Sequence, residues 1–321
     1  MLLQFLILSV GLALILFGAN WLVDGSSSIA KKTGMSEFII GLTIVGIGTS
    51  TPEMVVSFIS SIQGKADMAI GNIVGSNIFN TFVILGITAL ISPLVITKES
   101  LRRDLPLNIG VTALLIALGM KKSLLGCGSD TLTRVDGLLM LVIMALYFRL
   151  LLKNPKTTDD NSDIDGENTK IFSTGMSIVL ILVGLACLVI GGRCFVNAAT
   201  EIALYYKMSE KFIALTIMAA GTSLPELATS VVAAVKGRGQ LALGNIIGSN
   251  ISNILLILGG SALIHPLSFE AMTSVDLGVV MIGAILLFFS AFIFKKNKLG
   301  RIEGLMLLLL EAGYMTWLFM N

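Results

Sequence analysis

Charged residues are scarce in this sequence. Asp, Glu, Lys and Arg together make up 13% of the 321 residues, whereas about 25% is usual in a soluble domain. Hydrophobic residues make up 55% of the chain, and its mean hydropathy is +0.92. A chain with so little charge cannot cover a water-facing surface, and many of its apolar runs reach the roughly 20 residues that cross a bilayer. We therefore expect an integral membrane protein whose surroundings are the lipid bilayer.

Cysteine and histidine are also scarce, which limits the possible chemistry. The three cysteines, Cys127, Cys187 and Cys194, lack the spacing of metal ligands and predict neither disulfides nor zinc. The single histidine, His265, has no nucleophile or acid partner in the sequence. A glycine-rich phosphate loop is absent, which argues against an ATP-driven pump. The net charge of +2 is too small to indicate nucleic-acid binding. We expect neither an enzyme nor a resident cofactor, and no obligate protein partner is evident.

Apolar runs between charged or Pro/Gly breaks predict an all-α polytopic membrane protein. The ten predicted transmembrane helices cover residues 3–23, 37–62, 68–92, 104–120, 134–152, 173–192, 210–235, 241–264, 274–294 and 302–320. The first run lacks basic residues before it and a cleavage site after it, so we expect a retained helix and not a signal peptide. An acidic linker, expected to be cytoplasmic, covers 154–172 and separates two five-helix repeats, 1–153 and 173–321.

The positions of Lys and Arg predict the orientation. With the N-terminus outside, 15 of the 22 basic residues fall in inner loops, which agrees with the excess of positive charge on the cytoplasmic side of membrane proteins. We therefore expect a protein of the cell (inner) membrane with both termini outside.

The most informative feature is an internal repeat. Residues 41–80 and 214–253 align without a gap at an offset of 173, and 19 of the 40 positions are identical. The shared residues are mostly Gly, Thr, Ser, Pro, Glu and Asn, types that a membrane helix usually avoids. Because each half has an odd number of spans, the second copy enters the membrane from the opposite side. Inverted repeats of this kind form transport sites near the bilayer midplane.

Glu53 and Glu226 occupy matching positions near the middle of the second and seventh spans. An ionised carboxylate there costs about 2.5–3.5 kcal/mol and by default marks a pathway or a paired charge. Since no basic residue lies deep in a predicted span, a salt bridge is not available to either glutamate. A bound metal ion or a proton would supply the missing positive charge.

Proline precedes each glutamate, at Pro52 and Pro225. A proline inside a helix removes one N–H donor and displaces the carbonyl four residues earlier, here that of Gly48 or Gly221. Such backbone is tolerated at membrane depth only inside protein or along a cavity. Freed carbonyls, serine hydroxyls and two carboxylates would form the all-oxygen ligand set that Ca²⁺ prefers. Each proline alone could instead mark an ordinary kink, but two kinks at matched positions beside two glutamates favour the ligand interpretation.

A second polar motif opens the third and eighth spans. Asn72, Ser76 and Asn80 are spaced to lie on one face of a helix, and Asn245, Ser249 and Asn253 repeat the pattern. The accompanying GxxxG spacing favours close helix packing and has no functional weight of its own. The asparagines could be ligands or interhelical hydrogen-bond partners. We expect Asn72, Asn77, Asn245 and Asn250 to connect helices, and the deeper Ser76, Asn80, Ser249 and Asn253 to face the ion.

The paired blocks GTSTPE (48–53) with GNIVGSNIFN (71–80), and GTSLPE (221–226) with GNIIGSNISN (244–253), resemble the α-repeats of the calcium/cation antiporter superfamily. The closest resemblance is to its prokaryotic sodium/calcium exchangers. It implies exchange of one Ca²⁺ against several Na⁺ by alternating access.

The resemblance also implies a ligand set. Ca²⁺ would be held by the carboxylates of Glu53 and Glu226 and the carbonyls of Thr49 and Thr222. The remaining implied residues, for Na⁺ or beside the central position, are Ser50, Ser76, Ser223, Ser249, the carbonyls of Gly46 and Ala219, and Asn80 and Asn253. Several relatives carry Asp where this chain has Asn253, so two carboxylates remain here, enough to neutralise one Ca²⁺.

Two other classes of transport protein share these features. A channel also uses oxygen-lined sites, although the inverted repeat with broken helices favours a transporter. Among transporters, the alternative is an antiporter that exchanges protons for Ca²⁺ or another divalent cation and protonates Glu53 or Glu226.

Overall fold

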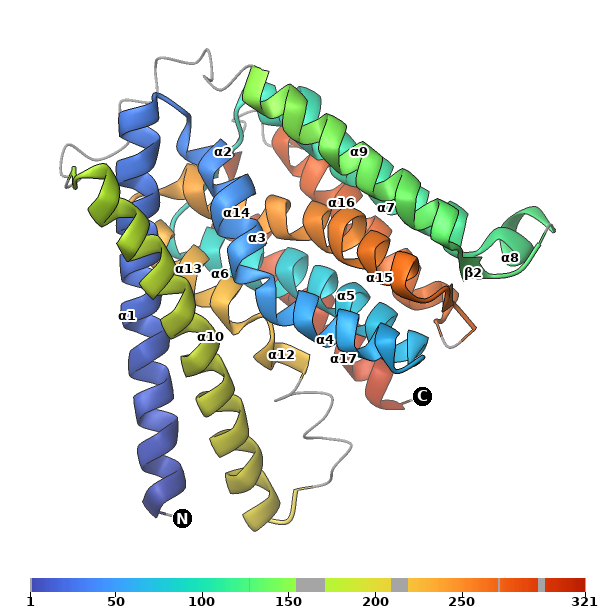
Figure 1. Cartoon of the computed structure of the whole chain (residues 1–321), viewed down its shortest axis with the longest axis horizontal. Coiled ribbons are helices and arrows are strands. Elements are labelled where there is room, and N and C mark those ends of the chain that lie inside the picture. The colour runs from blue at the N-terminus through green and yellow to red at the C-terminus, as the bar shows by residue number, and fades with distance from the viewer. Residues whose placement is uncertain are drawn as a thin grey trace.

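The computed structural model describes residues 2–126, 128–153, 171–208, 219–270, 272–293 and 298–320. Almost all of these residues are helical (Figure 1). Most of the predicted linker, 154–170, lies outside the described residues, as does the start of the predicted seventh span, 210–218.

The first half contains long helices interrupted by short π-helical stretches. Its elements are α1 (Leu2–Thr33), α2 (Glu37–Ile40), η1 (Gly41–Val45), α3 (Gly46–Thr49), α4 (Thr51–Ile62), α5 (Ala66–Ile78), η2 (Phe79–Ile84), α6 (Leu85–Ile91), β1 (Leu94–Val95), η3 (Ser100–Asp104), α7 (Leu105–Gly119), α8 (Lys121–Leu125), β2 (Thr131–Leu132) and α9 (Arg134–Lys153).

The second half repeats this order. Its described elements are α10 (Thr174–Tyr205), α12 (Ala219–Gly221), α13 (Leu224–Val235), α14 (Gly239–Ser252), η5 (Asn253–Leu258), α15 (Gly259–Ile264), β3 (Leu267–Ser268), α16 (Ser274–Ile293), β4 (Lys298–Leu299) and α17 (Arg301–Met320).

Five continuous helical segments are long and apolar enough to cross a membrane: Leu2–Thr33, Ala66–Ile91, Arg134–Lys153, Thr174–Tyr205 and Gly239–Ile264. The pair Glu37–Thr49 and Thr51–Ile62, bent by 47°, adds a sixth if it is one span. Helices also occupy the four other predicted spans, as α7, α13, α16 and α17, but these are shorter or more polar.

The helices α1 and α10 extend well past the predicted ends of their spans, at residues 23 and 192. In α1 the prediction stopped just before a run of polar residues, Ser26 to Ser28, that the structure buries. In α1, Ser28 is buried and accepts a 2.9 Å hydrogen bond from Ser177 of α10. Because this polar face packs on a partner helix, the helix continues where the apolar run ends.

Glycine contacts between α1 and α10 reveal a two-fold relationship. A Cβ on Gly11 would lie 2.9 Å from the carbonyl of Gly191, and one on Gly18 would lie 2.8 Å from that of Gly184. Gly184 and Gly191 follow Gly11 and Gly18 by 173 residues, so the two contacts exchange when the halves are exchanged. The pairing also shows that α1 and α10 run antiparallel, as the inverted repeat predicts.

The outer elements of the two halves are related by the same two-fold symmetry. Gly86 of α6 packs on Gly304 of α17, and the matching Gly259 of α15 packs on Gly137 of α9. Antiparallel pairing joins β1 to β4 and β3 to β2. Each half therefore places its last long helix on the third span of the other half.

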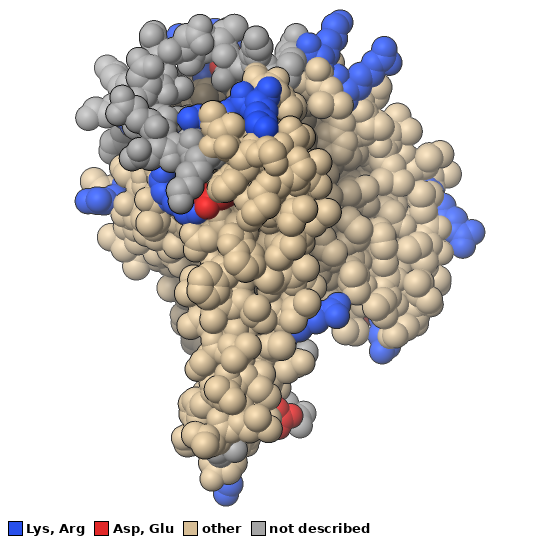
Figure 2. Space-filling model, turned by 60° about the vertical axis from the view of Figure 1, so that its left-hand side comes forward, with Lys and Arg blue, Asp and Glu red and all other residues tan. Residues whose placement is uncertain are grey.

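The helix α14 lies at the centre of the protein, and its residues from Leu241 to Ser252 are all buried. By contrast, α1 and α10 project beyond the rest of the bundle (Figure 1) and expose large apolar side chains such as Leu6, Phe17 and Leu182. Figure 2 shows that this projecting surface is almost free of charged side chains. Such a surface fits contact with lipid.

The α1–α10 crossing gives a first prediction. Gly18→Val should lower the stability of the protein, because the new side chain meets backbone of α10; overpacking of this kind costs about 1–3 kcal/mol. The melting temperature of purified protein, followed by size-exclusion chromatography after heating, measures the effect. The control is Gly110→Val in α7, where an added Cβ meets no described atom within 4 Å. Equal melting temperatures of the two variants would contradict close packing at this crossing.

Candidate cation-binding site

The site begins with two matched breaks in the helical backbone. At Ser50 the chain leaves α3 with φ −77° and ψ 11°, and at Ser223 it leaves α12 with φ −88° and ψ 7°. Pro52 and Pro225 then occupy the first turns of α4 and α13, where the missing N–H has no cost. Each proline therefore starts a new helix.

The two glutamates lie in those same first turns. Glu53 belongs to the first turn of α4 and Glu226 to that of α13, and both side chains are fully buried. The positive end of a helix dipole favours a negative charge at this place. The breaks therefore aim two helix N-termini and two carboxylates at the centre of the protein.

The carbonyl of Gly48 differs from its predicted state. Instead of being freed by the proline, it accepts a 2.7 Å hydrogen bond from the hydroxyl of Thr51. The sequence could not reveal this, because threonine returns to a nearby carbonyl only in a particular rotamer. The second half has Leu224 at the matching position and so lacks this hydroxyl.

Each glutamate is held by a serine of the other half. Ser50 donates a 2.9 Å hydrogen bond to Oε1 of Glu226, and Ser223 donates a 3.2 Å bond to Oε1 of Glu53. Ser76 lies 3.5 Å from the same oxygen of Glu53 and 3.1 Å from the hydroxyl of Ser223. The two halves of the repeat thus form one site, which the sequence predicted only by analogy of position.

Asparagines fix the glutamate helices to their neighbours. Asn72 donates to the carbonyl of Glu53 at 3.1 Å and to the hydroxyl of Ser57 at 3.0 Å. In the second half, Asn245 donates to the carbonyl of Glu226 at 3.4 Å and to Ser230 at 2.9 Å. The geometry agrees with our interpretation of these two asparagines as connections between helices.

Two further asparagines join the halves at the centre. Asn77 donates to the carbonyl of Asn250 at 3.2 Å, while the side-chain oxygen of Asn77 accepts from Asn253 at 2.9 Å. The matching oxygen of Asn250 accepts from Asn80 at 3.2 Å. Asn80 and Asn253 thus each donate a side-chain N–H to an asparagine of the opposite half. Their own side-chain carbonyl oxygens have no hydrogen-bond partner among the described residues. Asn80 lies in η2 and Asn253 begins η5, where the wider turn of a π-helix often marks a functional position.

Four buried oxygens at this centre lack a hydrogen-bond partner among the described residues. They are Oε2 of Glu53, Oε2 of Glu226, Oδ1 of Asn80 and Oδ1 of Asn253. A buried acceptor left unsatisfied costs about 1–3 kcal/mol, and more when it is charged. Four such acceptors from matched positions therefore indicate a bound species that donates or is positively charged.

Within the described part of the chain, no salt bridge involves Glu53 or Glu226. The described part of the chain also contains no group of three or more His, Cys, Asp or Glu side chains that could hold a metal ion. A cation at the centre would therefore be bound by two carboxylates and neutral oxygens, the hard ligands that suit Ca²⁺ and not zinc.

Two more of the predicted ligands, Gly46 and Thr49, contact α14. The carbonyl of Gly46 accepts from Ser249 at 3.1 Å, and the hydroxyl of Thr49 donates to Asn245 at 3.1 Å. Thr222 borders a small cavity between α4 and α10, and Ala219 begins α12 at the edge of the described residues. The structure thus brings Gly46 and Thr49 next to Asn245 and Ser249 of the second half-motif.

Sequence reasoning missed two supporting serines, Ser57 and Ser230, which anchor Asn72 and Asn245. Their identity at an offset of 173 could have revealed them. It also missed Thr81, which accepts a 2.9 Å bond from Asn250. Threonine in an apolar run gives no comparable signal.

Comparison with known proteins identifies the family. The model of the family described as "Sodium/calcium exchanger protein" matches residues 3–153 and 176–320 of this chain. The chain belongs to the sodium/calcium exchanger protein family. It is thus a membrane antiporter of a cation-transporting family and not a member of an enzyme class.

Several known proteins are similar along nearly the whole chain. The putative antiporter CaxA of Alkalimonas amylolytica is 39% identical, with 97% of each chain covered. The sodium/calcium exchanger MaX1 of Methanosarcina acetivorans is 36% identical, with 98% of each covered. Inner membrane protein YrbG of Escherichia coli is 34% identical over 100% of this chain and 97% of its own.

Solved structures show the same fold. The sodium-calcium exchanger NCX_Mj, soaked with zero Na⁺ and Ca²⁺, superimposes with a TM-score of 0.84 at 32% identity, covering 99% of each chain. This match confirms the predicted architecture of ten transmembrane helices in two inverted repeats. It also accounts for the four helices that length and hydropathy alone do not identify as spans.

The asparagine connections of this exchanger give a second prediction. Asn250→Ala should destabilise the protein by about 1–3 kcal/mol, because it leaves buried partners unsatisfied, and should weaken cation binding because Asn80 loses its partner. Thermal unfolding with and without Ca²⁺ measures both effects. Gln63→Ala, at an exposed position directly after α4, is the control. An unchanged stabilisation by Ca²⁺ in Asn250→Ala would show that Asn80 needs no such support.

Proposed function

We propose that this exchanger moves Ca²⁺ across the cell membrane against Na⁺, through the site between α4, α5, α13 and α14. The observation that carries the proposal is the set of four unpaired buried oxygens at Glu53, Glu226, Asn80 and Asn253. Two carboxylates neutralise one Ca²⁺, and neutral oxygens nearby raise the ligand number toward the 6–8 that Ca²⁺ takes. The name of the relative MaX1, a sodium/calcium exchanger, supports the same choice of ions.

In this proposal the two ions share the carboxylates and differ in the rest of their ligands. Ca²⁺ uses the carboxylates of Glu53 and Glu226 with the carbonyls of Thr49 and Thr222. Na⁺ adds the hydroxyls and carbonyls that complete the two half-motifs, namely Ser50, Ser76, Ser223, Ser249, Gly46 and Ala219. Because Ca²⁺ and Na⁺ compete for the same two negative charges, occupation by one displaces the other. Exchange of three Na⁺ for one Ca²⁺ would move one net charge per cycle, worth about 2.3 kcal/mol per 100 mV.

Transport through one site requires access from each side in turn, and the two sides of the structure differ. Near the end of α1, Lys236 donates to Asp24 at 2.6 Å and to the carbonyl of Asn20 at 3.3 Å. The positions that match Asp24 and Lys236 in the other half carry Asn197 and Gln63, which cannot form an ion pair.

On the side that carries Asn197, the helices leave a cavity where the other side has the ion pair. A space of about 180 Å³ lies between α4 and α10, and Val55, Asn197 and Thr222 are among its lining residues. With both termini outside, this cavity faces outward and the ion pair lies toward the cytoplasm. The structure therefore fits the state in which the site opens outward.

The ion pair between Asp24 and Lys236 gives a third prediction. Asp24→Asn should shift the population away from the outward-open state by up to about five-fold, since a partly exposed ion pair contributes roughly 0.2–1 kcal/mol. The readout is the labelling rate of Val55→Cys by a membrane-impermeant maleimide in whole cells, which should fall. Restoration of the rate by Asp24→Lys with Lys236→Asp would confirm the pairing. A rate that does not change in Asp24→Asn would remove the ion pair from the proposal.

The fourth prediction tests the exchange itself. Vesicles loaded with Na⁺ and diluted into Na⁺-free buffer should take up ⁴⁵Ca²⁺, and Glu53→Gln or Glu226→Gln should reduce uptake at least tenfold because each removes one of the two negative charges. Glu201→Gln, an exposed position of α10, is the matched control and should transport normally.

The same vesicles separate the coupling ions. Uptake driven by an outward proton gradient but not by Na⁺ would replace Na⁺ coupling with proton coupling and leave the two-carboxylate site in place. Full uptake by both glutamine variants would overturn the site assignment.

A further inference from the structure

A basic residue lies inside one of the long helices, where the sequence predicted none. The predicted sixth span ends at residue 192 and so excludes Arg193. In the structure α10 continues to Tyr205, which places Arg193 well inside this helix. The expectation that no basic residue lies deep in a span is therefore wrong at this position.

Two glycine contacts show how α10 passes the cation site. A Cβ on Gly48 would lie 2.8 Å from the side chain of Leu185, and one on Gly221 would meet the side chain of Val196. The two glycines begin the blocks GTSTPE and GTSLPE. Arg193 lies between Leu185 and Val196 on the same helix, and therefore at the level of the site.

The side chain of Arg193 is exposed and borders the cavity of about 180 Å³ between α4 and α10. Pro52 and Pro225, which directly precede the two glutamates, also line this cavity. Arg193 is the one charged residue among the described residues that line it. A cation that approaches the glutamates through this cavity therefore meets a positive charge.

The two-fold relationship explains why this charge lacks an acidic partner in the cavity. On the cytoplasmic side, Lys236 donates to the carbonyl of Asn20, the residue that matches Arg193 in the other half. Lys236 is also paired with Asp24, whereas Asn197 takes the place of Asp24 on the outward side. Each side thus has one basic residue at this level, and among the described residues only the cytoplasmic one has an acidic partner.

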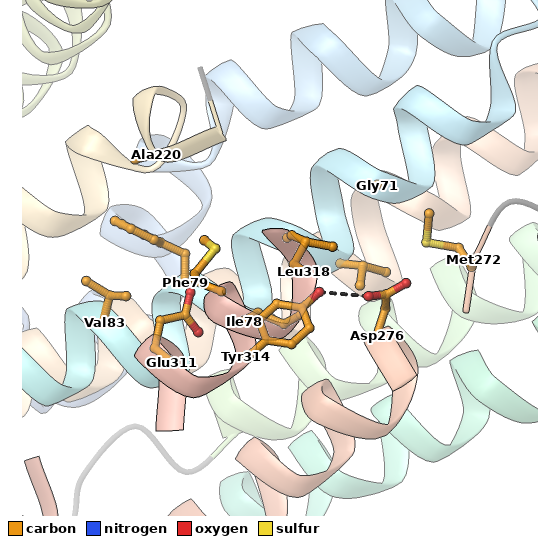
Figure 3. Close-up of a pocket in the computed structure, with 13 residues that line it drawn as sticks. Gly71, Ile78, Phe79, Val83, Ala220, Met272, Asp276, Glu311, Tyr314 and Leu318 are labelled. Atoms are coloured by element: carbon orange, nitrogen blue, oxygen red, sulfur yellow. Dashed lines mark hydrogen bonds between the residues drawn. The ribbon is translucent and has the colours of Figure 1, made fainter. Parts of the chain in front are cut away.

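Other polar and charged residues of the spans show what a structural role requires. Asp276 at the start of α16 accepts a 2.7 Å hydrogen bond from Tyr314 of α17, drawn as a dashed line in Figure 3. Asp104 accepts a 2.8 Å bond from Tyr147 of α9. Arg193 makes no such bond or ion pair with a described residue. Since a charge inside a span is costly and by default marks a functional position, Arg193 needs another explanation.

We propose that Arg193 limits the affinity of the cation site, more strongly for Ca²⁺ than for each Na⁺; this role rests on the proposed function. Its guanidinium repels every cation held by Glu53 and Glu226. The repulsion is twice as large for Ca²⁺ as for Na⁺, because the Coulomb energy is proportional to the charge of the ion. A transport site must bind its ion weakly enough to release it, and Arg193 favours that release.

Ion binding to purified full-length variants tests this role. Binding of ⁴⁵Ca²⁺ gives the dissociation constant for Ca²⁺, and competition gives that for Na⁺. Arg193→Gln should bind Ca²⁺ about tenfold more tightly and each Na⁺ about threefold more tightly, since the effect on a monovalent ion is the square root of that on a divalent one. Arg193→Glu should bind Ca²⁺ more tightly still, whereas Arg193→Lys keeps the charge and should retain both affinities.

The matched control for the loss of one positive charge is Lys122→Gln. Lys122 is exposed on α8, which lies far from α10 in Figure 1, so this variant should change neither affinity. Equal changes for Ca²⁺ and Na⁺ in Arg193→Gln, or the same changes in Arg193→Lys, would indicate altered packing and overturn the proposal. Unchanged affinities in Arg193→Gln and Arg193→Glu would overturn it as well.

Glu53→Gln, measured in the same way, separates the two proposals. Loss of Ca²⁺ binding in Glu53→Gln, together with unchanged affinities in the Arg193 variants, would overturn only the role of Arg193. Retained Ca²⁺ binding in Glu53→Gln would overturn the proposed cation site itself, and with it the role of Arg193 that depends on that site.

Discussion

The burial of two carboxylates without a fixed counter-charge is the constraint on which the rest of the structure depends. Glu53 and Glu226 are fully buried in an apolar bundle, where an unpaired charge is costly. The helix N-termini at the proline breaks and the serines donated across the repeat reduce that cost. They do not remove it, since one oxygen of each carboxylate stays without a described partner. The residual cost favours a bound cation, as the proposed function requires.

Because of the inverted repeat, the same types of residue surround each of the two buried carboxylates. Each half supplies a bent helix with a glutamate and a neighbouring helix with an asparagine stripe, and each donates its serine to the other half. Gly46 of α3 lies against the backbone of α14, and Gly248 of α14 lies against the backbone of Leu42, so the helices approach closely enough for these short side chains to meet. A short side chain such as serine or asparagine reaches a partner only across a close helix contact. The hydrogen bonds between the polar side chains therefore depend on the glycines that allow the helices to approach.

The two halves differ at several positions near the site, and these differences make the two sides of the protein unequal. The ion pair of Asp24 with Lys236 has no charged counterpart at Asn197 and Gln63, and a cavity borders Thr222 on that second side. The hydroxyl of Thr51 donates a hydrogen bond to the carbonyl of Gly48 in the first half. Leu224 occupies the matching position in the second half and has no hydroxyl. A transporter must open to either side with unequal stabilities of the two states, and such differences bias that equilibrium.

The sequence by itself determined the class of protein, the repeat and the identity of the central residues, because Glu53 and Glu226 recur at a fixed offset among residue types that apolar helices avoid. It also predicted that Asn72, Asn77, Asn245 and Asn250 connect helices, because they lie less deep in their spans than Asn80 and Asn253. Only the tertiary structure decided that Ser50 donates to Glu226 and Ser223 to Glu53, and that the side-chain oxygens of Asn80 and Asn253 lack a partner among the described residues. The physical reason is that a hydrogen bond or a counter-charge depends on what lies across a helix contact, and residues more than 140 positions apart meet there.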